Sequence, residues 1–279
     1  MSIIDSRPGP HFFSMPLHNY KGKIPFIITN LINRLEERNA DQQEGIFRLS
    51  GRKSEVDRIC TFMDRAPVTD WTQFEDMDNN VIACALKKYL QNLSSFDPLI
   101  GKDISDEVNS TIQLFSEDPT IYSRLKNLLE HSPLTRRNAL AYVMHYLKKI
   151  ADNSGVNNMN SYNLSVCFTL AIFPQTDTIA SGNSMKAFEL FINDFEQIFD
   201  PSWYDAANIL TPGDIEKLSA PIIDISDAKN EQMRRMVKKS SLIPYDRSML
   251  STFFLIERPN RPPPSPPHSP SQSPAVIPE

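Results

Sequence analysis

The chain has 279 residues, of which 40% are hydrophobic and 23% charged, so it can bury a full core as one large domain or two small ones. Its formal net charge of −5 argues against nucleic acid as the main partner, because surfaces that bind nucleic acid carry an excess of lysine and arginine. Of its 22 prolines, eight lie in residues 261–279, which predicts an extended, disordered tail there.

Charge is distributed unevenly along the chain. Residues 229–261 hold eight basic and three acidic side chains, about +5, so residues 1–228 carry about −9 once the acidic Glu279 is allowed for. We interpret the basic stretch as a solvated linker, with recruitment to an anionic membrane surface as the alternative.

The three cysteines, Cys60, Cys84 and Cys167, occupy apolar positions of helical patterns, and their spacing fits no metal site. We therefore expect reduced cysteines in the core and no bound metal. The N-terminus lacks the apolar core of a signal peptide. No stretch approaches the ~20 apolar residues of a membrane span, so the sequence predicts a cytoplasmic protein without a transmembrane segment.

The first part of the chain predicts three helices. One shows the i, i+3, i+4, i+7 spacing of a single helix face, at Ile28, Leu31, Ile32 and Leu35. A second is predicted to begin at Ser54, with Asp57 three residues on as a near capping box. A third is predicted over residues 78–93, where apolar residues again recur at helical spacing.

The middle of the chain continues this helical pattern. Residues 114–129 predict one or two shorter helices around Pro119. Ser132 and Pro133 form an N-cap followed by proline at the first helical position, so a longer helix is predicted to start there. Residues 152–160 are polar and predict a loop after that helix.

The last two predicted helices are the most apolar. Residues 164–173 are apolar nearly all round, which is typical of a helix buried at the centre of a bundle. Residues 185–199 present four large apolar side chains on one face. Since no strand pattern or internal repeat accompanies them, the predicted fold class is all-α, a compact multi-helix domain that ends near Tyr204.

The helical patterns and the proline-rich end divide the chain into four predicted segments. These are an N-terminal extension at 1–11, the helical domain at 12–204, a partly ordered extension at 205–260 and a Pro/Ser-rich disordered tail at 261–279. The extension holds short candidate helices at 215–218 and 230–237, and an apolar run at 250–256 that predicts a docking segment or a local strand.

Enzyme motifs are absent from the sequence. It contains no Gly-rich phosphate loop, no strand-borne nucleophile elbow and no paired-histidine metal helix. The five histidines are scattered, and we interpret His145, beside Met144 on a predicted helix, as structural. The sequence is therefore poorly equipped to catalyse a reaction alone.

The segment Gly45–Gly51, of sequence GIFRLSG, lies between two predicted helices. Its two glycines give the backbone room for positive φ. Ile46 and Phe47 can anchor it to the core, so that a single arginine, Arg48, is held at a fixed place on the surface. The alternative is an ordinary helix connection whose arginine happens to be exposed.

This segment resembles the arginine-finger loop of Rho GTPase-activating domains. Other segments resemble that family in the same order, namely Phe13–Leu17 with serine where glycine is usual, Ile24-Pro25, Leu86–Leu90, Arg137–Leu147 and Met159–Phe168. The resemblance covers about residues 12–204. It implies an all-α activator of a Rho-class small GTPase, of the Rho, Rac or Cdc42 type.

The resemblance also implies a mechanism. Arg48 would enter the partner's active site and stabilise charge on the phosphoryl oxygens, an effect of about 10³–10⁵-fold in rate. Arginine suits this role because its charge is permanent and its donors form a planar fork. Gly45, Phe47 and Gly51 would support the loop. The protein would need no cofactor of its own, because GTP and Mg²⁺ belong to the partner, and would have no stand-alone activity.

By the same resemblance, Lys87, Gln91 and Asn163 belong to the surface that binds the GTPase. Lys87 could pair with partner carboxylates, the alternative being a solvated lysine. Asn163 opens an apolar helix, where an amide needs hydrogen-bond partners. Its alternative role is a helix-capping or core-bridging asparagine.

Two positions depart from the family pattern. Gln91 stands where the family usually has an arginine that helps to hold the finger loop, and glutamine carries no charge. Thr169-Leu170 stands where the family has Gly-Pro, which predicts a longer helix. These departures favour an alternative function, a catalytically weak GTPase-binding scaffold or adaptor.

The tail carries a second motif. In residues 261–267, Arg261 is followed by prolines three and six positions later, which fits an extended ligand for a Src-homology-3 domain. The alternative is a plain solvated tail. Ser265, Ser269 and Ser273 each precede proline and are candidate phosphorylation sites.

Overall fold

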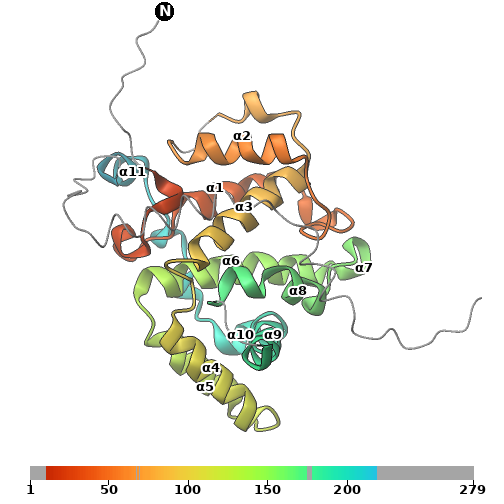
Figure 1. The fold of residues 1–279 in the computed structure, drawn as a ribbon, viewed down its shortest axis with the longest axis vertical. Coiled ribbons are helices and arrows are strands. Elements are labelled where there is room, and N and C mark those ends of the chain that lie inside the picture. Colours follow the sequence, from red (N-terminus) through yellow and green to blue (C-terminus); the bar gives the residue numbers. More distant parts are fainter. Residues whose placement is uncertain (1–10, 67, 69, 175–177, 219–279) are drawn as a thin grey trace, which may run out of the picture. The chain divides into compact units, whose positions relative to one another are not determined.

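The structure, a computed structural model, describes residues 11–66, 68, 70–174 and 178–218, with the backbone alone at 178–181 (Figure 1). Its helices are α1 (Phe26–Glu37), α2 (Lys53–Met63), α3 (Asn79–Ser94), α4 (Lys102–Phe115), α5 (Ile121–Glu130), α6 (Leu134–Asp152), α7 (Ser154–Asn157), α8 (Ser161–Ile172), α9 (Thr178–Asn193), α10 (Phe195–Ile198) and α11 (Pro212–Leu218). Short 3-10 turns lie at η1 (Phe12–Ser14), η2 (Leu17–Tyr20), η3 (Ala40–Gln42), η4 (Thr72–Phe74), η5 (Pro201–Trp203) and η6 (Ala206–Asn208). Within the described residues the only β contact is an isolated bridge between Ile24 and Ile209, so the all-α fold class is confirmed.

Three predicted helix starts, at Ser54, Asp78 and Ser132-Pro133, lie within two residues of the observed starts of α2, α3 and α6. Asp78 caps α3, since its Oδ1 accepts a hydrogen bond from the Asn80 N–H at 2.6 Å. α2 begins after Arg52 without a side-chain cap, so the predicted capping box at Ser54 is wrong. α6 begins after Pro133, whose extended ψ of 138° makes proline itself the N-cap in place of Ser132.

Three regions hold more helix than predicted, namely α4, α7 and the start of α9. α4 starts twelve residues before the predicted segment at 114–129, and its buried stripe is sparse and flanked by polar residues, at Ile104, Val108 and Ile112. The polar loop at 152–160 contains the one-turn helix α7. The helix predicted at 185–199 begins earlier, at Thr178. It is also not continuous, because it is interrupted at Asp194, which separates α9 from α10.

The core lies among α1, α3, α6, α8 and α9. α8 packs on α3 and α9, while α6 reaches α1, α8 and α9. α2 covers α3, and α4 and α5 pair with each other and pack on α9 and α10 respectively (Figure 1). Because α3 and α8 are direct neighbours, the loop that leads into α2 can contact both of them.

α8 is not buried on all sides, contrary to the prediction from its apolar composition. Leu164, Phe168 and Ile172 are fully buried. On the opposite face, however, Tyr162, Val166 and Leu170 are 54%, 47% and 47% exposed. We call these three residues the α8 strip. Its i, i+4, i+8 spacing places it along one line of the helix that no described element covers.

Packing continues beyond the predicted domain end at residue 204. The Ile24 N–H donates to the Asn208 carbonyl at 2.8 Å, and the Lys23 ammonium donates to the Ala207 carbonyl. Partly buried apolar residues then pack on the core, at Ile209, Leu210, Ile215 and Leu218. The predicted boundary therefore falls inside the packed part of the chain, and the predicted helix at 215–218 is confirmed as the end of α11.

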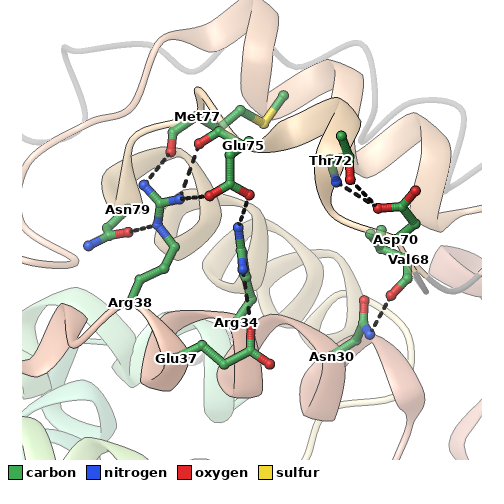
Figure 2. Close-up of polar contacts among 10 residues, drawn as sticks. All are labelled: Asn30, Arg34, Glu37, Arg38, Val68, Asp70, Thr72, Glu75, Met77 and Asn79. Carbon is green, nitrogen blue, oxygen red and sulfur yellow. Dashed lines mark hydrogen bonds and ion pairs between the residues drawn. The ribbon is translucent and has the colours of Figure 1, made fainter.

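Arg34 in the last turn of α1 and Arg38 directly after that helix hold the connection between α2 and α3, as Figure 2 shows. Arg38 donates from Nε to Asn79 Oδ1 at 2.6 Å and from its terminal nitrogens to the Glu75 and Met77 carbonyls at 3.1 Å each. Arg34 donates to Glu75 Oε2 at 2.7 Å. These bonds fix the N-terminal end of α3, which Gly51 approaches closely.

No helix among residues 11–218, leaving aside the undescribed positions in that range, is long and apolar enough to cross a membrane. Several predictions fall on residues that the structure does not describe. They concern the N-terminal extension, the basic stretch, the candidate helix at 230–237, the apolar run at 250–256 and the tail at 261–279.

Candidate functional site

The segment Gly45–Gly51, here called the finger loop, forms a tight turn between η3 and α2. The N–H groups of Arg48 and Leu49 both donate to the Gly45 carbonyl at 2.9 Å. Gly45 has φ +69°, which a glycine adopts without steric cost. The predicted need for positive φ is thus met at Gly45.

Gly51 serves a different purpose, since its φ is not in the positive region. A Cβ atom at this position would lie 2.6 Å from both the backbone nitrogen and the Cα of Val81. The loop backbone therefore lies directly on the first turn of α3, an approach that only glycine permits.

Phe47 anchors the loop in the core. Its side chain is fully buried, and its ring meets the Phe168 ring edge-to-face with centroids 4.9 Å apart. Its φ of +67° is rare for a bulky residue and is strained by about 1–3 kcal/mol. The Lys87 ammonium donates to the Phe47 carbonyl at 3.0 Å, so a charged hydrogen bond holds the strained peptide.

The buried Asn157 ties the start of the loop to the connection between α6 and α8. Its carbonyl accepts from the Gly45 N–H at 2.8 Å. Its side-chain amide donates to the Asp41 and Ile150 carbonyls at 2.7 and 2.8 Å, and its Oδ1 accepts from the Met159 N–H at 2.7 Å. The sequence does not single out Asn157, because this residue lies among several similar asparagines and serines.

Arg48, by contrast, is exposed, and its guanidinium forms no hydrogen bond or ion pair with any described residue. The backbone on both sides of it is fixed by Phe47 and by the turn onto Gly45. The result is a free cation on a rigid support.

Lys87 and Asn163 lie at the same site, although the side chains of both already form hydrogen bonds within this chain. Lys87 is bound to the Phe47 carbonyl. Asn163 donates from Nδ2 to the Asn158 carbonyl at 2.9 Å, and the Asn158 amide donates to Glu44 Oε1 at 3.1 Å. Asn163 is therefore linked through Asn158 to the residue that precedes the finger loop.

Gln91 lies one turn after Lys87 on α3, but the structure does not connect it to the finger loop. Its side chain is exposed and forms no hydrogen bond with a described residue. With glutamine at this position, the loop receives no hydrogen bond from the side chain of residue 91.

The α8 strip borders this site. Cys167, next to Val166 in sequence, lies close to both cations: burial raises the pKa of its thiol, and the nearby Lys87 and Arg48 act in the opposite direction. Leu49, in the loop itself, is 50% exposed. An exposed apolar surface therefore accompanies the free arginine.

Other candidate chemistry is lacking in the part of the chain that the structure describes. No group of three His, Cys, Asp or Glu side chains there could hold a metal ion. His145 stacks on Tyr204 with ring centroids 4.6 Å apart, and burial lowers the pKa of its imidazole. This environment fits the structural role expected for His145.

Known proteins are similar to this chain in both sequence and fold. The RhoGAP domain family model matches residues 25–177. Mouse Rho GTPase-activating protein 35 is 28% identical over 190 residues, covering 65% of this chain and 12% of that protein. Rho GTPase-activating protein gacY of Dictyostelium discoideum is 31% identical over 191 residues, covering 68% of this chain and 25% of that protein. The chain thus spans a quarter or less of these relatives' lengths.

Two solved structures have a similar fold. Human Rho GTPase activating protein 15 superposes with a TM-score of 0.61 at 21% identity, covering 68% of this chain and 92% of the other. The BH domain of GRAF, the GTPase regulator associated with focal adhesion kinase, gives 0.56 at 25% identity, covering 62% and 92%. Since the family model matches more than half of the sequence and the all-helical fold agrees, this chain belongs to the RhoGAP domain family.

Proposed function

We propose that this domain stimulates GTP hydrolysis by a Rho-class small GTPase, of the Rho, Rac or Cdc42 type, and that Arg48 is supplied in trans as the catalytic arginine. The observation that carries the proposal is the combination at Arg48 of a fixed backbone and an unpaired, exposed guanidinium. Structural arginines are normally paired, whereas a finger must be free until it meets the nucleotide.

The chemistry required of Arg48 is electrostatic. Negative charge is spread over the phosphoryl oxygens in the transition state, and a guanidinium stabilises it through permanent charge and several donors. A gain of about 10³–10⁵-fold corresponds to roughly 4–7 kcal/mol. A rigid loop makes this gain available because the arginine need not be ordered at the moment of reaction.

The surface beside Arg48 suits a protein partner. The α8 strip and Leu49 are exposed apolar residues, and polar Asn163 and the Arg48 cation accompany them, the mixture typical of transient interfaces. We propose that the GTPase covers this strip. Lys87 acts mainly on the finger loop, since its ammonium already has an acceptor in the Phe47 carbonyl.

The proposal assigns no cofactor to this protein. GTP and Mg²⁺ belong to the partner, and the isolated domain should hydrolyse nothing. The second candidate function, a catalytically weak GTPase-binding scaffold, is favoured by one observation: the Gln91 side chain forms no hydrogen bond with the finger loop. The predicted Src-homology-3 ligand at 261–267 would serve such an adaptor, but it lies outside the described residues.

The test is GTP hydrolysis by a panel of purified small GTPases with and without this protein. Arg48→Ala should lower the stimulated rate by about 10²-fold or more while binding to the GTP-bound partner survives. Arg65→Ala is the matched control, because Arg65 is an exposed arginine beyond the far end of α2. Strong binding by the parent protein without stimulation would favour the scaffold.

A second pair of variants tests where the partner binds. Val166→Asp should weaken binding to the GTP-bound partner at least about tenfold, because it places a charge in the apolar strip. Leu114→Asp is the matched control, since Leu114 is an exposed apolar residue on α4, 72% accessible. Equal affinities for both variants would contradict docking on α8.

A further inference from the structure

Cys84 lies on α3 one turn before Lys87, and its thiol meets the finger loop. Its Sγ accepts a hydrogen bond from the Gly51 N–H at 3.3 Å. The same sulfur lies 3.9 Å from the Leu49 carbonyl oxygen, to which the thiol donates. One thiol can fill both roles because it is a weak donor and a weak acceptor. Half-buried Cys84 thus contacts two backbone groups of the loop, where the sequence predicted only a core cysteine.

The close packing of Gly51 explains why a side chain provides this contact. The Gly51 backbone lies directly on Val81 at the first turn of α3. Carbonyl groups along a helix are occupied by their own i to i+4 hydrogen bonds. The Gly51 N–H therefore needs an acceptor from a side chain of α3, and Cys84 provides it.

The contacts from α3 lie on both sides of Arg48. On the N-terminal side, Lys87 donates to the Phe47 carbonyl at 3.0 Å. On the C-terminal side, Cys84 contacts Leu49 and Gly51. Movement of the loop away from α3 must break both sets of contacts, so α3 determines where the Arg48 backbone lies.

We propose that Cys84 is a positioning residue for Arg48. Its thiol holds the C-terminal half of the finger loop on α3 and thereby fixes the direction from which the guanidinium enters a partner's site. The assignment rests on the proposed function. In this role, Cys84 contacts neither the nucleotide nor the partner and acts only through the finger loop.

The first test measures maximal stimulated GTP hydrolysis and the protein concentration that gives half of it. Cys84→Ala should lower the maximal rate about three- to tenfold, because its two weak hydrogen bonds together contribute about as much as one ordinary bond, and leave the half-maximal concentration unchanged. Cys84→Ser should recover most of the rate, because a hydroxyl can also accept from Gly51 and donate to Leu49.

Cys60→Ala is the matched control. Cys60 is a buried residue of α2, and no hydrogen bond of the described residues joins its side chain to the finger loop. This variant should lower the melting temperature but not the maximal rate. In the Arg48→Ala background, Cys84→Ala should have no further effect on the rate. An equal loss in both backgrounds, or a loss of affinity alone, would overturn the proposal.

Amide hydrogen exchange tests the same contact without a GTPase. Peptides covering residues 45–51 should exchange faster in Cys84→Ala than in the parent protein or in Cys60→Ala, and Cys84→Ser should restore the protection. If the parent protein stimulates no GTPase, the proposed function fails while this measurement still reports on the loop. Unchanged exchange in Cys84→Ala would overturn the positioning role itself.

Discussion

At the scale of single residues, Phe47 shows how the site holds strain. A positive φ at a phenylalanine is strained by about 1–3 kcal/mol, while burying its ring contributes about 1.5–3 kcal/mol. Burial alone therefore only balances the strain. The charged hydrogen bond from Lys87 then makes the observed conformation of Phe47 favourable, because such bonds contribute roughly 1.5–3 kcal/mol.

This balance predicts the effect of removing the Lys87 ammonium. Lys87→Met should lower the maximal stimulated hydrolysis rate about tenfold or more, since the loop relaxes when its carbonyl loses the donor. Lys88→Met is the matched control, because Lys88 forms an exposed ion pair with Asp57, of a kind that contributes little. Single-turnover rates at saturating activator check this. A loss of affinity with an unchanged maximal rate would instead place Lys87 in contact with partner carboxylates.

Gln91 leads to a prediction in the opposite direction. It shares a helix face with Lys87, so an arginine there could add a charge-assisted contact to the loop. Gln91→Arg should raise stimulated hydrolysis several-fold, because charged hydrogen bonds contribute more than the ~1 kcal/mol of neutral ones.

The control for Gln91→Arg is the same change in the Arg48→Ala background, where no finger remains to be positioned. A double-mutant cycle on the hydrolysis rates measures this coupling. Equal gains with and without Arg48 would show that residue 91 acts on partner binding.

Some of these residues can be predicted from the sequence, and others cannot, for a physical reason. Arg48, Phe47 and the glycines stand out because a loop between helices needs an anchor and turn residues. Asn157 and Cys84 do not stand out, because their roles depend on which backbone groups happen to lie opposite them. Local sequence carries no information about such tertiary partners.

At the scale of elements, the finger loop depends on its fit to α3. The two surfaces meet backbone to backbone, so neither a side-chain rotation nor a small shift can relieve an added atom. The geometry of the loop is therefore set by the helix beneath it as much as by its own turn.

Gly51→Ala tests this fit. The added Cβ would lie 2.6 Å from Val81 backbone atoms, so the loop must lift away from α3. We expect a loss of about 1–3 kcal/mol in the free energy of unfolding and at least a tenfold lower stimulated rate. Gly155→Ala is the matched control, because nothing lies within 4 Å of its Cβ position in α7 and alanine favours helix. Urea unfolding and hydrolysis rates that match in the two variants would contradict the account.

Helix patterns predicted most elements but not their exposure. The stripe of α1 was recognised because four apolar residues repeat at helical spacing. Most of α4 was missed because its apolar residues are sparse. α8 was recognised as a helix but wrongly judged buried, because composition alone does not distinguish exposed apolar residues from buried ones.

At the scale of the whole molecule, the question is where the folded domain ends. The resemblance placed the end near residue 204. In the structure, the segment after residue 204 lies against the segment before α1, where the Ile24 N–H donates to the Asn208 carbonyl. Apolar residues of α11 also pack against the core. The resemblance to the family ends near residue 204, but apolar packing continues to residue 218. A few scattered apolar residues are enough to extend the core, and they form no pattern that the sequence reveals.

Truncation tests this boundary. A chain ending at residue 204 should melt about 5 °C or more below one ending at residue 218. The shorter chain loses the hydrogen bond between Ile24 and Asn208 and four partly buried apolar side chains. Deleting residues 261–279 is the comparison: a Pro/Ser-rich polar segment cannot bury enough apolar surface to join the core, so the melting temperature and the stimulated rate should stay unchanged. Equal melting temperatures for the 204 and 218 ends would show that the returning segment adds no stability. A clear drop on removing 261–279 would show that the tail packs on the domain.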